Sequence, residues 1–422
     1  NAQKKTRPAY TDKTLARAIV AGLNPEERKL DLLMPRFDFN NEDTANLIAY
    51  LKTLSFERAP GVTDTHIHFA TIFEKNIPNN EKRAMLRVFY EFIKTRNTDT
   101  RPRTRRAEHA PWNMSWHYES HRVWSFHPWE VSGPKDTWFS KMELQYAREP
   151  VFAIIGGMGV GDWTPVHEFC EKYAIPCLFP STDLPPLTEK DFYSIYFSAG
   201  LALEARVLAK FLHKNKKTAI DANIIQIVQD TDRGKLPAKI FREQMKDYGF
   251  TAVTDFVIPA QGKPIADQAT VNDLANKNNI LVYWLDEKTI SSSYKKFSNS
   301  KSQSYMSAGL IGIRQQLHKT NIKLVGSNYM IYPYVKPDKL EQNIQANFSW
   351  LKLRKIPIIN EIMQANTLYA LKLVNRAMKH ISSNFSREYL IEKLEHLVRS
   401  IALSTVYPQL SLAPGQRFGS KG

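Results

Sequence analysis

Glycine residues crowd the stretch from Gly156 to Gly161, at the end of the apolar run 150–157. A glycine-rich turn after a buried strand is typical of dinucleotide sites, because glycine lets the backbone approach the phosphates closely. Here Gly156, Gly159 and Gly161 have the spacing Gly-x-x-Gly-x-Gly, which departs from the Gly-x-Gly-x-x-Gly pattern of such turns. The sequence therefore argues against a nucleotide cofactor and against a nicotinamide-dependent enzyme.

The cysteines and two of the histidines are candidates for redox or metal chemistry. The only cysteines are Cys170 and Cys177, and the sequence leaves two alternatives open, a local disulfide bond and two buried thiols. Zinc would need further ligands, and only His167 stands near the pair. His66 and His68 alternate along an expected strand and share one face, which permits a metal site, but we expect them to be packed or hydrogen-bonded.

No catalytic constellation is visible in the sequence. It contains no Gly-x-Ser-x-Gly turn and no phosphate-binding Walker loop in a fitting context. We therefore expect a protein that is not an enzyme.

The chain has 422 residues, too many for one ordinary core, so two or three units are expected. No apolar run approaches the roughly 20 residues that span a bilayer. The formal net charge is +16, but the basic residues are spread out apart from the run 101–106, which we expect to form a solvated loop. No nucleic-acid motif accompanies that run, so nucleic acid is not an expected partner. The chain starts at Asn1 without a visible leader, and we expect a signal peptide to have been removed.

Strand and helix patterns alternate along most of the chain, which predicts parallel, doubly wound α/β sheets. We expect a first sheet over 66–198 and a second over 223–286, with residues 320–335 returning to the first lobe. Two successive α/β units predict two lobes with a cleft outside the carboxyl ends of their strands. We expect the cleft to be lined by the loops that follow Phe73, Gly157, Pro180, Asp230 and Asp286.

Residues 10–54 resemble the C-terminal part of a class I c-type cytochrome. The resemblance rests on a helix pattern near 12–22, the loop Leu33-Met-Pro-Arg-Phe37 and a closing helix near 41–54 with an N-cap in 41–43. It implies that Met34 is an axial haem-iron ligand. The Cys-x-x-Cys-His motif for covalent haem is missing, so we expect no cofactor within this chain and haem c only if an upstream segment supplies that motif.

Residues 64 to about 405 resemble a type I periplasmic binding protein, the branched-chain amino-acid class of ABC-transporter substrate-binding proteins. The segments that carry the resemblance, in matching order and spacing, are 150–157, 165–173, 175–182, 192–198 and 227–234. Together with the N-terminal segment and the tail from Pro408, they resemble a subgroup fused to a cytochrome domain. The implied domains are a helical segment at 1–58, one lobe at 64–198 and 320–405, a second lobe at 199–319, and an extended tail at 406–422.

The resemblance also implies where a ligand binds. In the family, the loop after the Gly-Gly strand and the next Ser/Thr loop hold the carboxylate and ammonium of an amino acid. Arg233 replaces the family's lid tyrosine, and a guanidinium suits a carboxylate or a phosphate, although it could instead cap its helix turn or pair with Asp230 or Asp232. The implied ligand-binding residues are Gly157, Met158, Gly159, Val160, Ser181, Thr182, Asp230, Arg233 and Asp286.

These observations predict a periplasmic, non-enzymatic protein that captures a small, polar, carboxylate-bearing ligand between two lobes for an ABC transporter. Its expected partners are that ligand and the membrane subunits of the transporter, while the chain itself does not span the membrane. The alternative is a redox accessory protein, associated with cytochrome c, that uses the binding fold as a scaffold to dock on a periplasmic oxidoreductase.

Overall fold

The computed structural model of the protein describes residues 10–31, 35–53, 59–109, 122–188, 191–215, 223–250, 252–260, 279–290, 303–310, 327–381, 385–400 and 403–421. The chain forms two compact units, residues 1–58 and 59–422, and each is described by itself.

The N-terminal unit contains two helices, α1 (Asp12–Ala21) and α2 (Asn41–Thr53), where the sequence predicted them. Thr11 caps α1 through a reciprocal pair of hydrogen bonds with Thr14, which satisfies N–H groups that a helix start leaves free. The backbone N–H of Asp43 donates to the side chain of Asn40 at 2.8 Å, so the polar cap of α2 lies just before the expected 41–43. Met34 lies outside the described residues, and its role as an iron ligand stays a prediction.

Lobe 1 is built on a seven-stranded sheet with the order β6-β4-β1-β3-β5-β7, in which β2 also pairs with β1. Every pairing is parallel. The strands are β1 (His66–Glu74), β2 (Val123–Val131), β3 (Ala153–Ile155), β4 (Met158–Asp162), β5 (Cys177–Leu178), β6 (Ser181–Leu184) and β7 (Ser194–Ile195).

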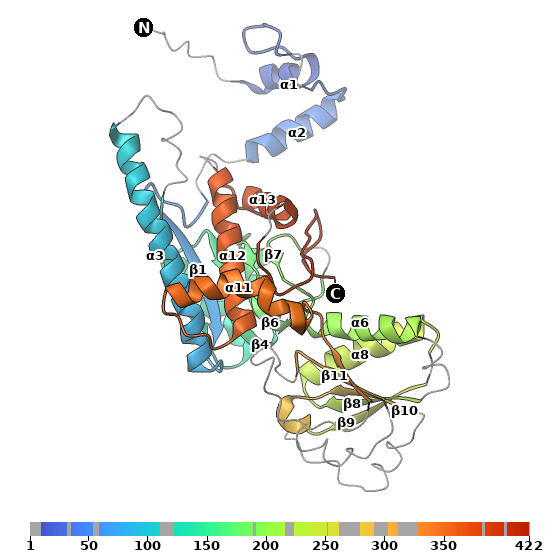
Figure 1. Ribbon diagram of the computed structural model, residues 1–422. Coiled ribbons are helices and arrows are strands. Elements are labelled where there is room, and N and C mark those ends of the chain that lie inside the picture. The colour runs from blue at the N-terminus through green and yellow to red at the C-terminus, as the bar shows by residue number, and fades with distance from the viewer. Residues whose placement is uncertain are drawn as a thin grey trace. The chain divides into compact units, whose positions relative to one another are not determined.

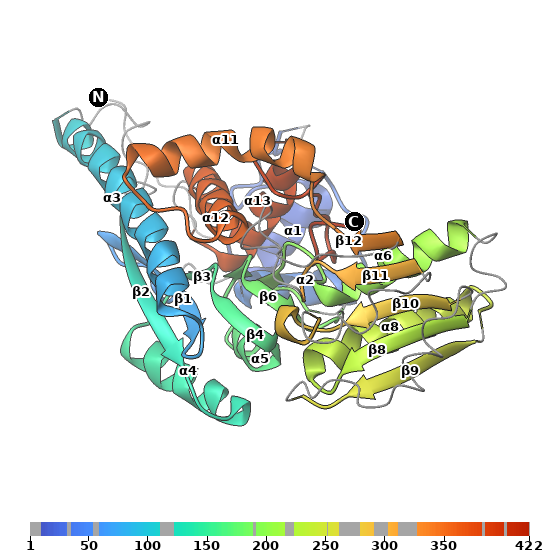
Figure 2. The same cartoon turned by 60° about the horizontal axis from the view of Figure 1, so that its bottom comes forward.

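Helices cover both faces of this sheet (Figure 2). On one face, α3 (Asn79–His109), α12 (Glu361–His380) and α13 (Arg387–Ser400) share an apolar core with side chains of β1 and β3, and α11 (Pro337–Leu353) joins them. On the other, α4 (Trp138–Arg148), which follows the short 3₁₀ helix η3 (Lys135–Thr137), and α5 (Thr164–Lys172) pack against alternate residues of β1 and β2. The basic run 101–106, expected to be a loop, continues α3.

Lobe 2 holds a second parallel sheet of five strands with the order β12-β11-β10-β8-β9, against which α6 (Leu201–Lys214) and α8 (Asp232–Asp247) pack (Figures 1 and 2). Its strands are β8 (Asn223–Gln229), β9 (Val253–Ile258), β10 (Asn279–Trp284), β11 (Gln303–Ser307) and β12 (Ser327–Ile331). The sequence did not predict β11. Because β12 pairs with β11, the chain returns to lobe 1 only after Ile331, and the prediction of a return from residue 320 is wrong.

The tail beyond residue 406 lies in contact with lobe 1. Phe418 forms a parallel bridge with Tyr196 beside β7, and the backbone N–H of Ser420 donates to the carbonyl of Phe197 at 2.7 Å. Arg417 donates to the carboxylate of Glu395 on α13 at 2.7 Å, and both side chains are almost fully buried. The tail thereby adds an extended segment to the edge of the first sheet.

A buried arginine at the start of α13 connects separate parts of lobe 1. Arg387 is only 5% exposed. Its guanidinium donates to the carbonyls of Pro60, Val151, Phe152, Tyr173 and Ala174 and to the hydroxyl of Tyr146. One side chain therefore binds the segment before β1, the start of β3 and the turn after α5.

We predict that Arg387→Met lowers the free energy of unfolding by about 3 kcal/mol or more, because each buried carbonyl left without a donor costs about 1–3 kcal/mol. Chemical denaturation followed by tryptophan fluorescence measures this. Arg399→Met is the matched control, since Arg399 is exposed on the same helix and should change stability little. Equal effects of the two substitutions would contradict the assignment.

Candidate functional site

A cavity of about 390 Å³ lies between the two lobes and brings together most of the predicted ligand-binding residues. Lobe 2 contributes residues of α8, of the turn after β10 and of the turn after β11, and lobe 1 contributes β4, β6 and the segment that leads into α3. The predicted residues that line it are Met158, Gly159, Val160, Ser181, Arg233 and Asp286.

Arg233 is held in the cleft by the start of α8. The side chain of Thr231 caps this helix by accepting from the backbone N–H of Gly234 at 3.3 Å, which places Arg233 in the first turn. The Arg233 guanidinium points to lobe 1, where its Nη2 donates to Asp183 Oδ2 at 2.8 Å. The alternatives of helix capping or pairing with Asp230 or Asp232 are therefore not what the structure shows.

The Arg233–Asp183 pair joins the two lobes across the cleft. The side chain of Asp183 is 10% exposed and that of Arg233 is 27% exposed, so solvent screens this pair less than a surface ion pair. Gly200 holds the crossing segment tightly over Asp183, because a Cβ at this position would lie 2.1 Å from the Asp183 carbonyl oxygen. The segment at Gly200 therefore packs against the backbone of Asp183, the residue that pairs with Arg233.

Asp286 approaches the same guanidinium from the end of β10. Its carboxylate accepts from the backbone N–H of Thr289 at 2.8 Å and from the side-chain amide of Gln229 at 3.0 Å. Burial alone would raise the pKa of Asp286, but these hydrogen bonds and the charge of Arg233 outweigh burial and lower it. Asp286 is therefore ionised at neutral pH, and its charge interacts with that of Arg233.

The stretch 158–160 differs from the loop that the sequence predicted. It belongs to strand β4, which pairs with β6, and it does not lie at a helix start. The backbone N–H of Val160 donates to the carboxylate of Glu74 at 2.8 Å, so a carboxylate of the protein already occupies one of the expected anion donors. Packing requires a glycine at position 159, because a Cβ there would lie 2.3 Å from the Trp163 ring.

Three predicted ligand residues do not line the cleft. Gly157 is not part of the cleft lining, and its carbonyl accepts from the backbone N–H of Ser181 at 2.8 Å. Thr182 faces a second, smaller cavity. Asp230 pairs with Lys235 on the surface of lobe 2.

The cleft also contains charged residues that the sequence did not single out. Its lining carries four carboxylates and two cations, which are the predicted Asp286 and Arg233 together with Glu81, Asp183, Glu287 and Lys288. Asn360, at the start of α12, also lines it and donates to Glu81 at 3.1 Å. Only their position at strand ends and helix starts of an expected cleft could have indicated these residues in advance.

The cysteines and histidines lie outside the cleft. Cys170 and Cys177 are free, buried thiols, the second of the two alternatives, and burial together with Cys177 raises the pKa of Cys170 well above its usual value. His68 Nδ1 lies 2.9 Å from His127 Nε2, so His68 is a hydrogen-bonded side chain.

The part of the chain that the structure describes shows neither a candidate metal site nor a candidate membrane-spanning helix. No group of three or more His, Cys, Asp or Glu side chains is arranged to hold a metal ion there. Within the same residues, no helix is both long and apolar enough to cross a membrane.

Known structures share this fold. The sequence matches no protein-family model and no curated protein. Among solved structures, a putative branched-chain amino acid ABC transporter from Rhodospirillum rubrum superposes with a TM-score of 0.57 at 15% identity, over 85% of this chain and 96% of that one. A solute-binding protein of an ABC transporter from R. palustris, in complex with benzoate, gives 0.56 at 11% identity, over 83% and 90%.

A third structure, an ABC transporter substrate-binding protein from Desulfitobacterium hafniense in complex with Leu, gives a TM-score of 0.51 at 13% identity, over 84% of this chain and 94% of that one. At these identities the likeness establishes the fold alone. That fold is the mixed α/β architecture with parallel sheets of the type I periplasmic binding proteins.

We predict that Asp183→Asn increases the population in which the lobes stand farther apart, because it removes one charge of the partly buried pair across the cleft. A loss of about 1 kcal/mol would change the ratio of closed to open forms about fivefold. Small-angle scattering of the ligand-free protein measures the radius of gyration, with Asp230→Asn, which removes a surface pair within lobe 2, as the control. An unchanged radius in Asp183→Asn would contradict a joining role.

Proposed function

We propose that this protein is a substrate-binding protein that captures a small, carboxylate-bearing molecule between its two lobes and delivers it to an ABC transporter. The observation that carries this proposal is a single nitrogen of Arg233. Its Nε is buried and has no hydrogen-bond partner among the described residues, while Nη2 is engaged by Asp183. A buried N–H of a charged guanidinium without an acceptor is costly, and a ligand oxygen in the cleft would satisfy it.

The chemistry of the cleft supports a carboxylate as that acceptor. Hydrogen bonds between a guanidinium and a carboxylate are among the strongest that a protein forms with a small molecule. Benzoate and leucine, bound by two proteins of the same fold, both carry a carboxylate. The surplus of acidic groups around Arg233 means that the ligand should bring only one negative charge to this position.

The proposed role also sets the place of action and the partners. A protein that hands its ligand to an ABC transporter meets the membrane subunits of that transporter outside the cytoplasmic membrane, which for this protein would be the periplasm. The two-lobed fold supports ligand capture without catalysis, and the partners are the small molecule and the transporter.

The N-terminal unit carries a separate proposal, that it belongs to a haem c domain with Met34 as an axial ligand and serves a redox partner. Two helices flank the Met34-Pro35 segment, in the order that the resemblance implies. A Soret band in protein purified from its native source, with about one haem per chain, would support it. Colourless protein would contradict it.

We predict that wild-type protein binds at least one monocarboxylate from a panel of benzoate, leucine and aliphatic acids, and that Arg233→Lys weakens this binding more than tenfold. Lysine can still pair with Asp183 but does not reproduce the planar fork or its Nε donor, and a hydrogen bond to a charged group is worth about 1.5–3 kcal/mol. Isothermal titration calorimetry measures the affinity.

Lys246→Ala is the matched control, because Lys246 is exposed in the last turn of the same helix and lines neither cavity between the lobes. The amides of the same acids serve as ligand controls and should not bind. Binding of the amides as tightly as the acids, or unchanged affinity in Arg233→Lys, would refute the carboxylate proposal.

A further inference from the structure

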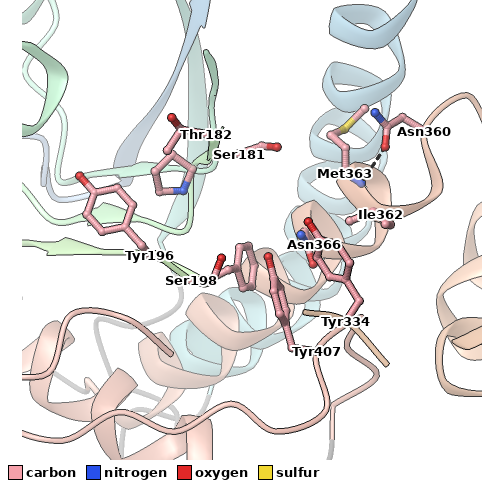
Figure 3. Close-up of a pocket in the computed structure, with 12 residues that line it drawn as sticks. Ser181, Thr182, Tyr196, Ser198, Tyr334, Asn360, Ile362, Met363, Asn366 and Tyr407 are labelled. Atoms are coloured by element: carbon pink, nitrogen blue, oxygen red, sulfur yellow. Dashed lines mark hydrogen bonds between the residues drawn. The ribbon is translucent and has the colours of Figure 1, made fainter. Parts of the chain in front are cut away.

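A second cavity lies in lobe 1 beside the cleft. Figure 3 shows the side chains that line it. It encloses about 30 Å³ between the start of β6, the segment that follows β7 and the first turns of α12. Ser181 and Asn360 line both this chamber and the cleft, so the two cavities share a wall. A group that enters the chamber from the ligand side would pass these two residues.

Asn366 gives the chamber an unsatisfied hydrogen-bond acceptor. Its side chain lines the chamber from α12 and is 7% exposed (Figure 3). Its Oδ1 is buried and accepts no hydrogen bond from the described residues. Asn360, the N-cap of α12, instead has a partner at each end of its side-chain amide, since its Oδ1 accepts from the backbone N–H of Met363 and its Nδ2 donates to Glu81.

The walls of the chamber define what can meet Asn366. None of the residues that line it has an acidic, basic or imidazole side chain. A charged group inside would therefore be buried without a counter-charge, which is strongly unfavourable. Hydroxyl groups of Ser181 and Ser198 line the same space, and its volume suffices for one or two water molecules, each of which needs about 10–15 Å³.

We propose that the chamber is a binding site for a neutral O–H donor, which Asn366 Oδ1 recognises. Ordered water fills it in the free protein, and a hydroxyl group of the ligand displaces that water in the complex. The second half of this proposal rests on the proposed function, because it makes the ligand a hydroxylated carboxylic acid. The carboxylate meets Arg233 in the cleft, and the hydroxyl reaches past Ser181 into the chamber.

The first experiment concerns water alone. A crystal structure of the ligand-free protein at high resolution should show a water oxygen within hydrogen-bond distance of Asn366 Oδ1. An empty chamber, or a protein donor on Oδ1, would overturn the proposal. This result does not depend on whether the protein binds any acid.

The second experiment compares acids that differ by one hydroxyl, such as benzoate with 4-hydroxybenzoate and butyrate with 4-hydroxybutyrate, by calorimetry. In the wild-type protein at least one hydroxylated acid should bind about tenfold more tightly than its parent, the value of one added hydrogen bond. Asn366→Leu should bring that ratio to about one and leave the affinity for the parent acid unchanged. Asn375→Leu, on the same helix and outside the chamber lining, should keep the ratio.

The two proposals fail in different ways. Parent acids that bind as tightly as their hydroxylated forms in the wild-type protein would overturn the ligand half of the chamber proposal and leave the proposed function standing. A protein that binds none of the acids would refute the proposed function, and the ligand half with it, while the crystal structure decides the water half. Loss of all binding in Asn366→Leu with an intact fold would contradict a chamber that selects only the hydroxyl.

Discussion

The geometry of lobe 1 depends on the buried guanidinium of Arg387. Backbone carbonyls just before or after a helix or strand lack a partner within that element. When they are buried they need another hydrogen-bond donor, because an unpaired buried carbonyl destabilises the fold. Arginine is the only side chain with five N–H donors in a rigid planar fork, and it can therefore serve several carbonyls that point to it from different directions. In this protein it joins the segment before β1 to the start of β3 and to the turn after α5. The relative positions of these strands, and of the cleft at their far ends, follow from this arrangement.

The cleft itself is a balance between groups that attract an anion and carboxylates that compete for the same groups. Glu74 takes the N–H of Val160, and Asp183 takes one nitrogen of Arg233. Asp286 remains ionised beside the same guanidinium because hydrogen bonds to its charged form outweigh burial. The buried Nε–H of Arg233 is left without an acceptor among the described residues, and a ligand can supply one. Such a site discriminates by shape and by hydrogen-bond pattern more than by net charge.

The sequence predicted elements whose pattern is set by local burial and missed those that depend on distant partners. The apolar runs at 150–155 and 280–284 indicated buried parallel strands, and both are found. The strand Gln303–Ser307 escaped prediction because it contains polar residues. The hydroxyl of the buried Ser307 donates to Glu204 on α6, a partner that is distant in sequence.

The same limit applies to the site. Residues 158–160 were expected near the ligand, and they do line the cleft, but Glu74 and Asp183 lie far from them and from Arg233 in sequence. Asp230 and Asp232, the neighbours of Arg233 in the chain, are the partners that a single sequence favours. In the folded protein, Arg233 instead pairs with Asp183, whose carboxylate is distant in sequence.

The parallel bridge between Tyr196 and Phe418 has a consequence for how the protein reaches its native state. A short strand at the edge of a sheet exposes unpaired backbone groups, which makes it a template for association with other chains. Here the edge at β7 is covered by a segment from a distant part of the chain, so that edge stays open until residues far apart in sequence have met. Contacts of such long range form slowly, because chain entropy must be lost before they are made. The docked tail therefore removes an exposed strand edge from lobe 1.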